Sequence, residues 1–497
     1  MSSNRYVPRL SKSRYMAGKQ CHLRLWNECF ARELATPVDE AQQAIFDTGH
    51  EVGELAMGRY PGGVMIAEGP RELAAARERT SAAMAGDAPA IFEAAFEHQG
   101  VTCRVDVLVR APNGEWDLVE VKSTGSAKDV HVEDLAVQAW IVRGAEVKVR
   151  SAGILTLNTK YVYKGGELDL GALFKIHDRT DEVAELAEPL SLELLEQKAV
   201  LAGERAPEVA PSPHCHKPYP CKFHDHCWEN VRVPLHPITD LPGMRGENIA
   251  RWKEQGIVDI LDLPEEADLK HLQERARQCV RTGHNYRGPG LAAALAEPSF
   301  PIHHLDFESF MPVIPRYPGT RPFHALPVQW SNHIEHEDGS LEHRQFLWTK
   351  QEDPRPACAR SLLDAVGEEG TIVIYSPYEV RMVKELMEVV PEHRAALMRL
   401  LPRMWDLHPI IKEHFYHCAF RGSFSIKSVL PALVPEMSYE GLDIADGRTA
   451  QLEYRRMIDA EDAVERERIR KALLSYCEQD TLAMLKLREA LAREVAG

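Results

Sequence analysis

Two strand-like runs joined by a tight turn constrain the fold of this chain more than any other feature of its sequence. Residues 101–110 (VTCRVDVLVR) and 115–123 (EWDLVEVKS) alternate apolar and polar side chains, as strands with one face on a core do. The Pro-Asn-Gly sequence at 112–114 fits a type I turn followed by a left-handed residue. The sequence therefore predicts an antiparallel hairpin in which Ala111 pairs with Glu115.

The register of this hairpin decides which side chains face each other. With Ala111 opposite Glu115, valine faces valine on one side and Asp106 faces Glu120 on the other. A loop one residue shorter would set a carboxylate against a valine and spoil the apolar face. Two carboxylates across a strand pair repel each other, so a divalent metal is expected between them. Lys122 shares their face and could orient a water; the alternative is a solvated polar face.

These residues resemble a known family. Asp106 followed by the tripeptide 120–122 (EVK) resembles the signature of the PD-(D/E)XK nucleases. His50 in GHEVGEL resembles the metal-binding histidine of the RecB-like branch, and Gln138 in LAVQAWIV resembles the glutamine that follows its core. The resemblance implies a restriction-endonuclease-like domain in which Lys122 assists the attacking water and Mg²⁺ or Mn²⁺ is bound by three ligands: His50, Asp106 and Glu120.

Four of the ten cysteines form a pattern of their own. Cys215, Cys221 and Cys227 recur at equal spacing within HCHKPYPCKFHDHCW, and Cys21 lies 194 positions before the first of them. One early and three late cysteines around a nuclease core resemble the iron–sulfur RecB-like nucleases, whose four thiolates hold a 4Fe–4S cluster that ties the ends of the domain together. The rival interpretation is a structural zinc held by three cysteines and one of four histidines: His214, His216, His224 or His226.

The segment after the cysteines is short and helical. Within residues 238–264, Leu241-Pro242-Gly243 precedes a helical run, which looks like half of a helix-hairpin-helix. Such a motif contacts phosphate through backbone N–H groups without reading bases. A helical spacer that packs between the flanking regions explains the same residues equally well.

Acidic residues recur on a strand and a helix of the C-terminal part. The run 303–310 (HHLDFESF) places Asp306 and Glu308 on one face of a strand expected over 302–310. The run 372–379 (IVIYSPYE) predicts a strand that enters a helix carrying Glu379. The three carboxylates therefore lie on elements that a mixed α/β sheet would bring together.

The expected C-terminal helix, from about Ala460 to Val495, contains a carboxylate where an apolar residue belongs. Asp480 falls within its apolar stripe, and Tyr476 lies one turn earlier on the same face. An unpaired carboxylate inside an apolar face is costly, so a bound metal ion would explain it. The plainer interpretation is that Asp480 caps or ion-pairs with a neighbouring element.

A DxE pair on a first strand, an acidic residue in a middle helix and YxxxD in a closing helix resemble the three motifs of the DEDD exonucleases, whose fold is RNase H-like. The resemblance implies that Tyr476 orients the attacking water and that four carboxylates bind metal: Asp306, Glu308, Glu379 and Asp480. Glu379 stands where that family usually has aspartate. Asp406, in MWDLHP, is similar to an aspartate that is more often structural than catalytic in that family.

Charge limits how this chain can bind nucleic acid. Its 497 residues carry a net charge of −16, so the overall field opposes the approach of phosphates. Binding then needs a local basic groove or bound cations. The run 420–430 (FRGSFSIKSVL), with Lys412, His414 and Arg421 nearby, could form such a groove or a solvated loop.

No apolar run approaches the ~20 residues needed to cross a bilayer, and residues 1–20 have no signal-peptide core. We therefore expect a cytoplasmic protein without a membrane partner. Three regions are expected: an iron–sulfur RecB-like nuclease domain over 1–232, a helical linker over 233–296 and an RNase H-like domain over 297–497. This order resembles a family of bacterial proteins in which the two nuclease-type domains are fused.

Together these features predict a metal-dependent DNA nuclease, an exonuclease by resemblance, with two centres in which divalent ions activate a water. Single-stranded or end-bearing DNA is the substrate that the resemblance implies. Two alternatives stay open. In one, a single centre cuts and the other clamps nucleic acid; in the other, the chain is a non-catalytic iron–sulfur scaffold that binds DNA for partner proteins.

Overall fold

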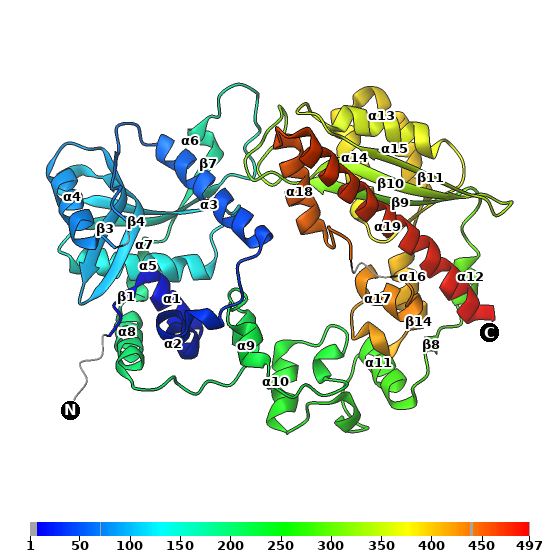
Figure 1. Cartoon of the computed structure of the whole chain (residues 1–497), viewed down its shortest axis with the longest axis horizontal. Coiled ribbons are helices and arrows are strands. Elements are labelled where there is room, and N and C mark those ends of the chain that lie inside the picture. Colours follow the sequence, from blue (N-terminus) through cyan, green and yellow to red (C-terminus); the bar gives the residue numbers. More distant parts are fainter. Residues whose placement is uncertain (1–6, 70, 438–440, 497) are drawn as a thin grey trace. The chain divides into compact units, whose positions relative to one another are not determined.

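The computed structural model describes residues 7–69, 71–437 and 441–496, and it divides into two compact units (Figure 1). Unit 1 comprises Met1–Val231 with Pro312–His324, and unit 2 comprises Arg232–Met311 with Ala325–Gly497. The outermost ends of the expected first and last domains, residues 1–6 and 497, lie outside the described residues. Within the described ranges, none of the helices combines the length and apolar character that a bilayer crossing requires.

Unit 1 is built on a mixed seven-stranded sheet in the order β2-β3-β4-β5-β6-β7, with β1 beside β4. Strand β4 pairs antiparallel with both β3 and β5. Strands β5 and β6 pair parallel to each other, and helix α5 connects them in the sequence. The elements are β1 (Leu10–Ser11), α1 (Lys12–Gln20), α2 (His22–Phe30), α3 (Glu40–Gly58), β2 (Val64–Met65), α4 (Leu73–Ala85), β3 (Ala90–His98), β4 (Val101–Arg110), β5 (Trp116–Lys122), α5 (Asp129–Gly144), β6 (Val149–Leu157), α6 (Leu170–Leu173), β7 (Phe174–Asp178), α7 (Thr180–Glu185), α8 (Ala187–Ala202) and α9 (His224–Trp228).

The expected hairpin is confirmed in its register but not in its turn. The ladder between β4 and β5 pairs Val107 with Val119, and the Ala111 N–H donates to the carbonyl oxygen of Glu115 at 2.9 Å. The ladder ends at this valine pair, so the expected pairing of Asp106 with Glu120 is not part of it. Gly114 is left-handed as expected, with φ +72°, but Asn113 is left-handed too, with φ +62°. Asparagine adopts this conformation more readily than other non-glycine residues, so the turn accommodates it and the pairing of Ala111 with Glu115 is kept.

The regular alternation of side chains between the two faces of β4 is interrupted beside Asp106. Val105 and Leu108 belong to one core cluster and Val107 to the other, although regular alternation would group Val105 with Val107. Across the ladder, Glu93 of β3 has a φ of +55° and stands between two paired positions. A left-handed residue breaks the regular pleat, so the expectation of one continuous apolar face is wrong at this point.

Unit 2 contains a five-stranded sheet in the order β11-β10-β9-β12-β13. Strands β9, β10 and β11 are antiparallel, and β12 and β13 run parallel to β9. The elements are α10 (Gly246–Glu254), α11 (His271–Thr282), β8 (Tyr286–Arg287), α12 (Leu291–Leu295), β9 (Ile302–Phe310), β10 (Leu326–Glu335), β11 (Leu341–Leu347), α13 (Arg355–Val366), β12 (Thr371–Ile374), α14 (Tyr378–Val389), α15 (Arg394–Leu400), β13 (Met404–Asp406), α16 (Leu407–His414), β14 (Phe415–Tyr416), α17 (Ile426–Leu433), α18 (Gly447–Asp459) and α19 (Ala463–Ala496).

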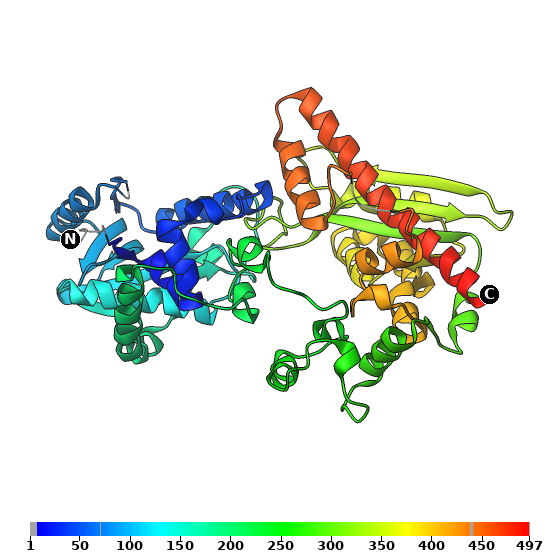
Figure 2. The ribbon, with the colours of Figure 1, turned by 60° about the horizontal axis from the view of Figure 1, so that its bottom comes forward.

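The central strand β9 and the long helix α19 match the elements expected from the sequence. Leu305 and Phe307 of β9 pack in a core cluster with residues of α13, α14 and α15. The alternate residues of β9 face α19, which crosses β9 and β10 in both views of the ribbon (Figures 1 and 2). Because β9 has a strand on each side, side chains that project from it toward α19 are held on a rigid, buried element.

The segment expected as a linker, 233–296, folds as short helices within unit 2. Residues of this segment, among them Trp252 and Leu291, share a core cluster with Leu487 of α19. The segment thus packs with the C-terminal region by burying apolar side chains.

Candidate functional site

Three carboxylates converge in unit 2. Asp306 and Glu308 project from β9 and Asp480 projects from α19, and one carboxylate oxygen of each residue lies within 4.8 Å of those of the other two. The two-residue period of the strand puts both β9 carboxylates on the α19 face. Asp480 lies in the apolar stripe of α19, so its side chain points toward the same place, as its sequence position indicates.

Further side chains complete a cavity around these carboxylates. Glu379, at the start of α14, is 3% exposed, and Ser376 Oγ donates to its Oε2 at 3.4 Å. Tyr476 lies one helical turn before Asp480 and lines the same cavity. The structure therefore brings together the five residues that were singled out from the sequence by their resemblance to DEDD-type motifs. The cavity is also lined by Tyr375, His408 and Met484, which were not predicted as part of this centre, and by three residues of the run 420–430: Ser425, Ile426 and Lys427.

The electrostatics of this cavity favour a cation. Burial, together with the neighbouring carboxylates, raises the pKa of Asp306 well above its usual range. Burial and the Asp480 carboxylate raise the pKa of Glu308 to about 8, and burial raises that of Glu379 to about 7. Crowded carboxylates in a low-dielectric pocket must be neutralised by protons or by metal ions.

The run 420–430 contributes one basic side chain to the cavity. Lys427 lines it, with its Nζ 5.9 Å from the centre of the Tyr476 ring, and donates to the Ala445 carbonyl at 2.7 Å. Arg421 instead lies 3.9 Å from Asp240, and Lys412 is exposed. The local positive charge at this centre therefore comes from Lys427.

Asp406 has a structural position. It ends β13, and its Oδ1 accepts from the His408 N–H at 3.0 Å at the start of α16. A carboxylate that accepts a free N–H of the first turn stabilises a helix. This contact agrees with the structural role that the sequence suggested.

Unit 1 also holds a buried polar centre. Glu120 of β5 is 2% exposed, and its Oε1 accepts from Lys122 Nζ at 2.6 Å and from Lys12 Nζ at 2.9 Å. Its Oε2 accepts from Gln138 Nε2 at 2.6 Å, and Asp134 of α5 accepts from Lys122 Nζ at 2.6 Å. Burial alone would raise the pKa of Glu120, but the two ammonium groups hold it well below its usual range.

Asp106 lies beside this network at the interrupted position of β4. Its Oδ2 accepts from the Val121 N–H at 2.7 Å. Burial and the Glu120 carboxylate raise the pKa of Asp106 to about 8. Across the ladder, burial also raises the pKa of Glu93. Irregular backbone beside buried acids is a feature of functional sites, and here it places three acidic side chains near one another.

His50 lies at the edge of this centre. Its side chain is on the exposed side of α3, and it is near enough to Glu93 to oppose the rise in the pKa of that carboxyl. Among the described residues, His50, Asp106 and Glu120 do not form a set of three ligand atoms within 4.8 Å of one another. Their expected joint role as metal ligands stays a prediction.

Two buried residues of this centre were missed from the sequence. Asp134 lies four residues before Gln138, so the helical period alone could have placed both on one face of α5. Lys12 offered no such signal, because its contact with Glu120 spans 108 positions. Long-range ion pairs of this kind depend on the tertiary fold and leave no local pattern.

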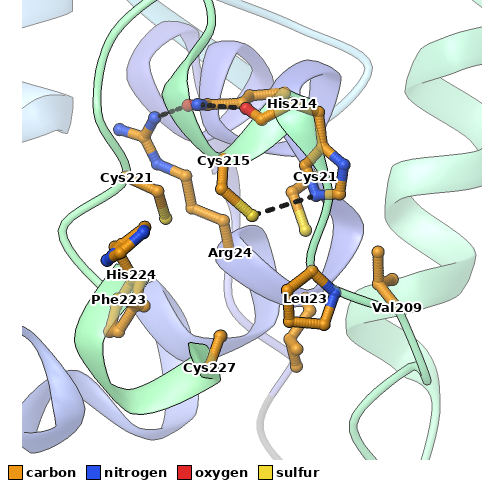
Figure 3. Close-up of a pocket in the computed structure, with 12 residues that line it drawn as sticks. Cys21, Leu23, Arg24, Val209, His214, Cys215, Cys221, Phe223, His224 and Cys227 are labelled. Carbon is orange, nitrogen blue, oxygen red and sulfur yellow. Dashed lines mark hydrogen bonds between the residues drawn. The ribbon is translucent and has the colours of Figure 1, made fainter. Parts of the chain in front are cut away.

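Four cysteines surround one pocket of unit 1. Cys21, Cys215, Cys221 and Cys227 line it, and Figure 3 shows them arranged around a common space. The side chain of Gln20 donates at 2.8 Å to the carbonyls of His214 and Tyr219, which fastens the N-terminal helices to the cysteine loop. His214 Nε2 lies 3.7 Å from Cys215 Sγ.

The spacing of these thiols bears on what they could hold. Zinc bound at about 2.3 Å by each thiolate brings tetrahedral sulfurs to within about 4 Å of one another. In the part of the chain that the structure describes, the four thiols supply no set of three sulfurs that all lie within 4.8 Å of each other. As placed, the thiols are therefore spaced more widely than the sulfurs around a bound zinc ion.

Part of the chain is similar to a known protein family. Residues 303–425 match the model of a family described as "Domain of unknown function (DUF2779)". This match includes Asp306, Glu308 and Glu379 and ends before α19. A solved structure described as "Crystal structure of SSO0001" is 14% identical, with a TM-score of 0.23, over 46% of this chain and 91% of that chain. No curated protein matches the sequence.

Proposed function

We propose that this protein is a metal-dependent nuclease that hydrolyses phosphodiester bonds in DNA, with its principal centre in the acidic cavity of unit 2. The convergence of Asp306, Glu308 and Asp480 within 4.8 Å is the observation that carries the proposal. Oxygen ligands of this kind suit Mg²⁺ or Mn²⁺. A divalent ion bound there would lower the pKa of a water and stabilise the departing oxygen.

Residues of the acidic cavity would have different roles in this reaction. Asp306, Glu308 and Asp480 bind metal, with Glu379 beside Asp306 as the fourth carboxylate of an RNase H-like, DEDD-type centre. The Tyr476 hydroxyl orients the attacking water. Lys427 places a positive charge at the cavity, where the phosphate of the substrate would lie. Single-stranded or end-bearing DNA, cut in the cytoplasm, is the substrate we propose.

A second centre is proposed in unit 1, in a domain of PD-(D/E)XK type. There His50, Asp106 and Glu120 would bind metal and Lys122 would assist the water. The short contacts of Lys122 and Gln138 with Glu120 support an organised site. Lys12 already pairs with Glu120, so a metal ion would have to displace its ammonium group.

We also propose that the four cysteines hold a 4Fe–4S cluster. The wide spacing of their thiols favours a cluster over zinc. Such a cluster joins Cys21 to residues almost two hundred positions later, so its role would be to stabilise unit 1 rather than to take part in hydrolysis.

The test is cleavage of end-labelled single- and double-stranded DNA with Mg²⁺ or Mn²⁺ by anaerobically purified protein. Four variants are compared with the wild type: Lys122→Ala, Asp306→Ala, the double substitution, and Asp364→Asn as an exposed acidic control on α13. Residual activity in both single variants, with none in the double variant, supports two centres. Undiminished cleavage by the double variant rejects the proposal.

One observation favours a second candidate function. In unit 1, Lys12 and Lys122 already neutralise Glu120 and Asp134 without a metal ion. Unit 1 would then be a non-catalytic iron–sulfur scaffold that binds nucleic acid, and unit 2 would hold the single centre. In that case Asp306→Ala alone abolishes cleavage and Lys122→Ala leaves it unchanged.

A further inference from the structure

A second group of metal-ligating side chains lies in unit 2, outside the acidic cavity. His333 of β10 and His343 of β11 stand directly opposite each other in the antiparallel ladder. Glu478 of α19 completes the group, and the ligand atoms of the three residues all lie within 4.8 Å of one another. Cross-strand pairing and the packing of α19 on the hairpin thus bring together residues that are far apart in the sequence.

Hydroxyl groups hold both imidazole rings. Ser331 Oγ lies 2.9 Å from His343 Nε2, and Thr481 Oγ1 lies 2.8 Å from His333 Nδ1. The two hydroxyls are themselves 2.8 Å apart. Metal-binding histidines are characteristically held by a hydrogen bond at their second ring nitrogen. His343 therefore has its Nε2 beside Ser331 and its Nδ1 on the side of Glu478.

An ion pair is a poor explanation of this arrangement. His343 Nδ1 lies 3.7 Å from Glu478 Oε1, beyond a good hydrogen bond. A neutral imidazole, by contrast, is a common ligand of a metal ion, to which it donates a lone pair.

We propose that His333, His343 and Glu478 bind one Zn²⁺ ion, with water in the remaining coordination position. Two imidazoles and a carboxylate suit a borderline transition metal, whereas the oxygen-only group of Asp306 suits Mg²⁺ or Mn²⁺.

One movement is needed for binding. The two rings stack with their centres 4.4 Å apart and their planes at 25°, so one ring must rotate before both nitrogens point at one ion. His343 can make this rotation, because it lies on the edge strand β11 and its side chain is 22% exposed. The bound ion would fasten the edge of the hairpin to α19, independently of any cleavage activity.

Co²⁺ tests the proposal, because it replaces Zn²⁺ and its visible absorption reports the ligands. Full-length protein that keeps its iron–sulfur cluster is treated with EDTA to remove labile divalent ions and then titrated with Co²⁺ in the presence of excess Mg²⁺, which occupies oxygen-only sites, and difference spectra are recorded. The expected result is a visible band that Zn²⁺ abolishes and that lacks the near-ultraviolet charge-transfer band of thiolate ligands. His343→Ala is expected to remove this band, and Glu478→Gln to weaken binding by at least about tenfold.

His336→Ala is the matched control, because this exposed histidine of the same hairpin pairs with Glu342 and lies outside the group. It should bind Co²⁺ as the wild type does. Glu478 is exposed, so Glu478→Gln leaves the fold intact, as circular dichroism would verify. An identical visible spectrum and Co²⁺ affinity in the wild type, His343→Ala and Glu478→Gln would overturn the proposal.

Discussion

Asp306 is half-buried on the central strand of unit 2 among three other carboxylates, an arrangement that destabilises the fold unless protons or cations neutralise it. Glu308, Glu379 and Asp480 share this cost. Stability is commonly sacrificed in this way where function needs a strained or charged site. At the scale of single residues, the acidic cavity is therefore the part of the molecule whose chemistry is hardest to explain by packing alone.

Removing one of these charges should stabilise the metal-free protein. Asp480→Asn keeps the side-chain shape and relieves repulsion with Asp306 and Glu308, so we expect the thermal midpoint of unit 2 in EDTA to rise by about 2–4 °C, equivalent to about 1 kcal/mol. The same variant should lose the stabilisation that saturating Mg²⁺ gives the wild type. Thermal scans with and without Mg²⁺ measure both effects.

Glu489→Gln is the matched control, because Glu489 is an exposed acid on the same helix that pairs with Lys486 at 2.9 Å. Its midpoint should change little, as is usual for surface positions. A lower midpoint for Asp480→Asn in EDTA, together with an unchanged response to Mg²⁺, would contradict the assignment of Asp480 as a metal ligand.

The raised pKa values predict a pH dependence with a definite sign. Glu308 and Glu379 have pKa values of about 8 and about 7 in the folded protein, above the usual carboxyl range, so the folded state binds more protons than the unfolded state at neutral pH. Protonation of these two carboxyl groups therefore stabilises the metal-free fold. This contribution is complete below about pH 4.3, the usual carboxyl pKa, and is lost as the pH rises toward 8. Thermal scans in EDTA between pH 5 and 8.5 should show it, and Mg²⁺ should flatten the decline.

Lys12 provides a residue-scale test in unit 1. Lys12→Met leaves Glu120 and Asp134 with one lysine instead of two, and breaking a buried ion pair costs about 3–5 kcal/mol. We expect a thermal midpoint of unit 1 lower by roughly 10 °C. Lys19→Met, on the same helix but with a half-exposed pair to Glu193, should cost less than about 1 kcal/mol. Equal, small losses in both variants would show that Lys12 is not essential to this network.

At the scale of the element, hydrophobic periodicity correctly predicted the strand and the helix from which residues of the acidic cavity project. The strand over 302–310 and the C-terminal helix have the expected positions, and the buried stripe of α19 contains Tyr476 and Asp480 as expected. These predictions succeed because a two-residue or 3.6-residue period is a local property of the sequence. The hairpin register succeeded for a similar reason, since the turn length sets it.

The failures at this scale have a common cause. The break in β4 beside Asp106 depends on the left-handed Glu93 of a neighbouring strand, which no pattern within β4 reveals. Lys427 reaches the acidic cavity, and His333 meets His343, only through tertiary packing. Local periodicity identifies which face of an element is buried, but not which polar residues from other elements meet that face.

The cysteine pocket gives a prediction for α2 and the loop before α9. Cys21→Ser should lower the iron content of anaerobically purified protein from about four per chain, and should destabilise unit 1 by about 5 kcal/mol, the order expected for opening a cross-linked loop of this length. Iron analysis, the brown absorption and thermal scans measure this. Cys29→Ser changes a cysteine of α2 outside the pocket and should leave the iron unchanged. A colourless wild-type protein with one zinc per chain would reject the cluster.

At the scale of the whole molecule, net charge and local charge act in opposite directions. The chain carries a net charge of −16, which repels nucleic acid, and the acidic cavity adds to this repulsion when it holds no cation. Divalent ions in the cavity would reverse the local sign, with Lys427 assisting. The account therefore makes metal binding a precondition of DNA binding, as well as of hydrolysis.

The central claim is that Asp306, Glu308 and Asp480 together bind catalytic divalent ions. The most direct measurement is the anomalous difference density of Mn²⁺ in crystals of the full chain, grown or soaked with Mn²⁺ and measured near the manganese absorption edge. A peak is expected within bonding distance, about 2.2 Å, of oxygens from all three residues, and this peak should be lost in Asp480→Asn crystals. Well-ordered crystals with saturating Mn²⁺ and no peak among these carboxylates would contradict it.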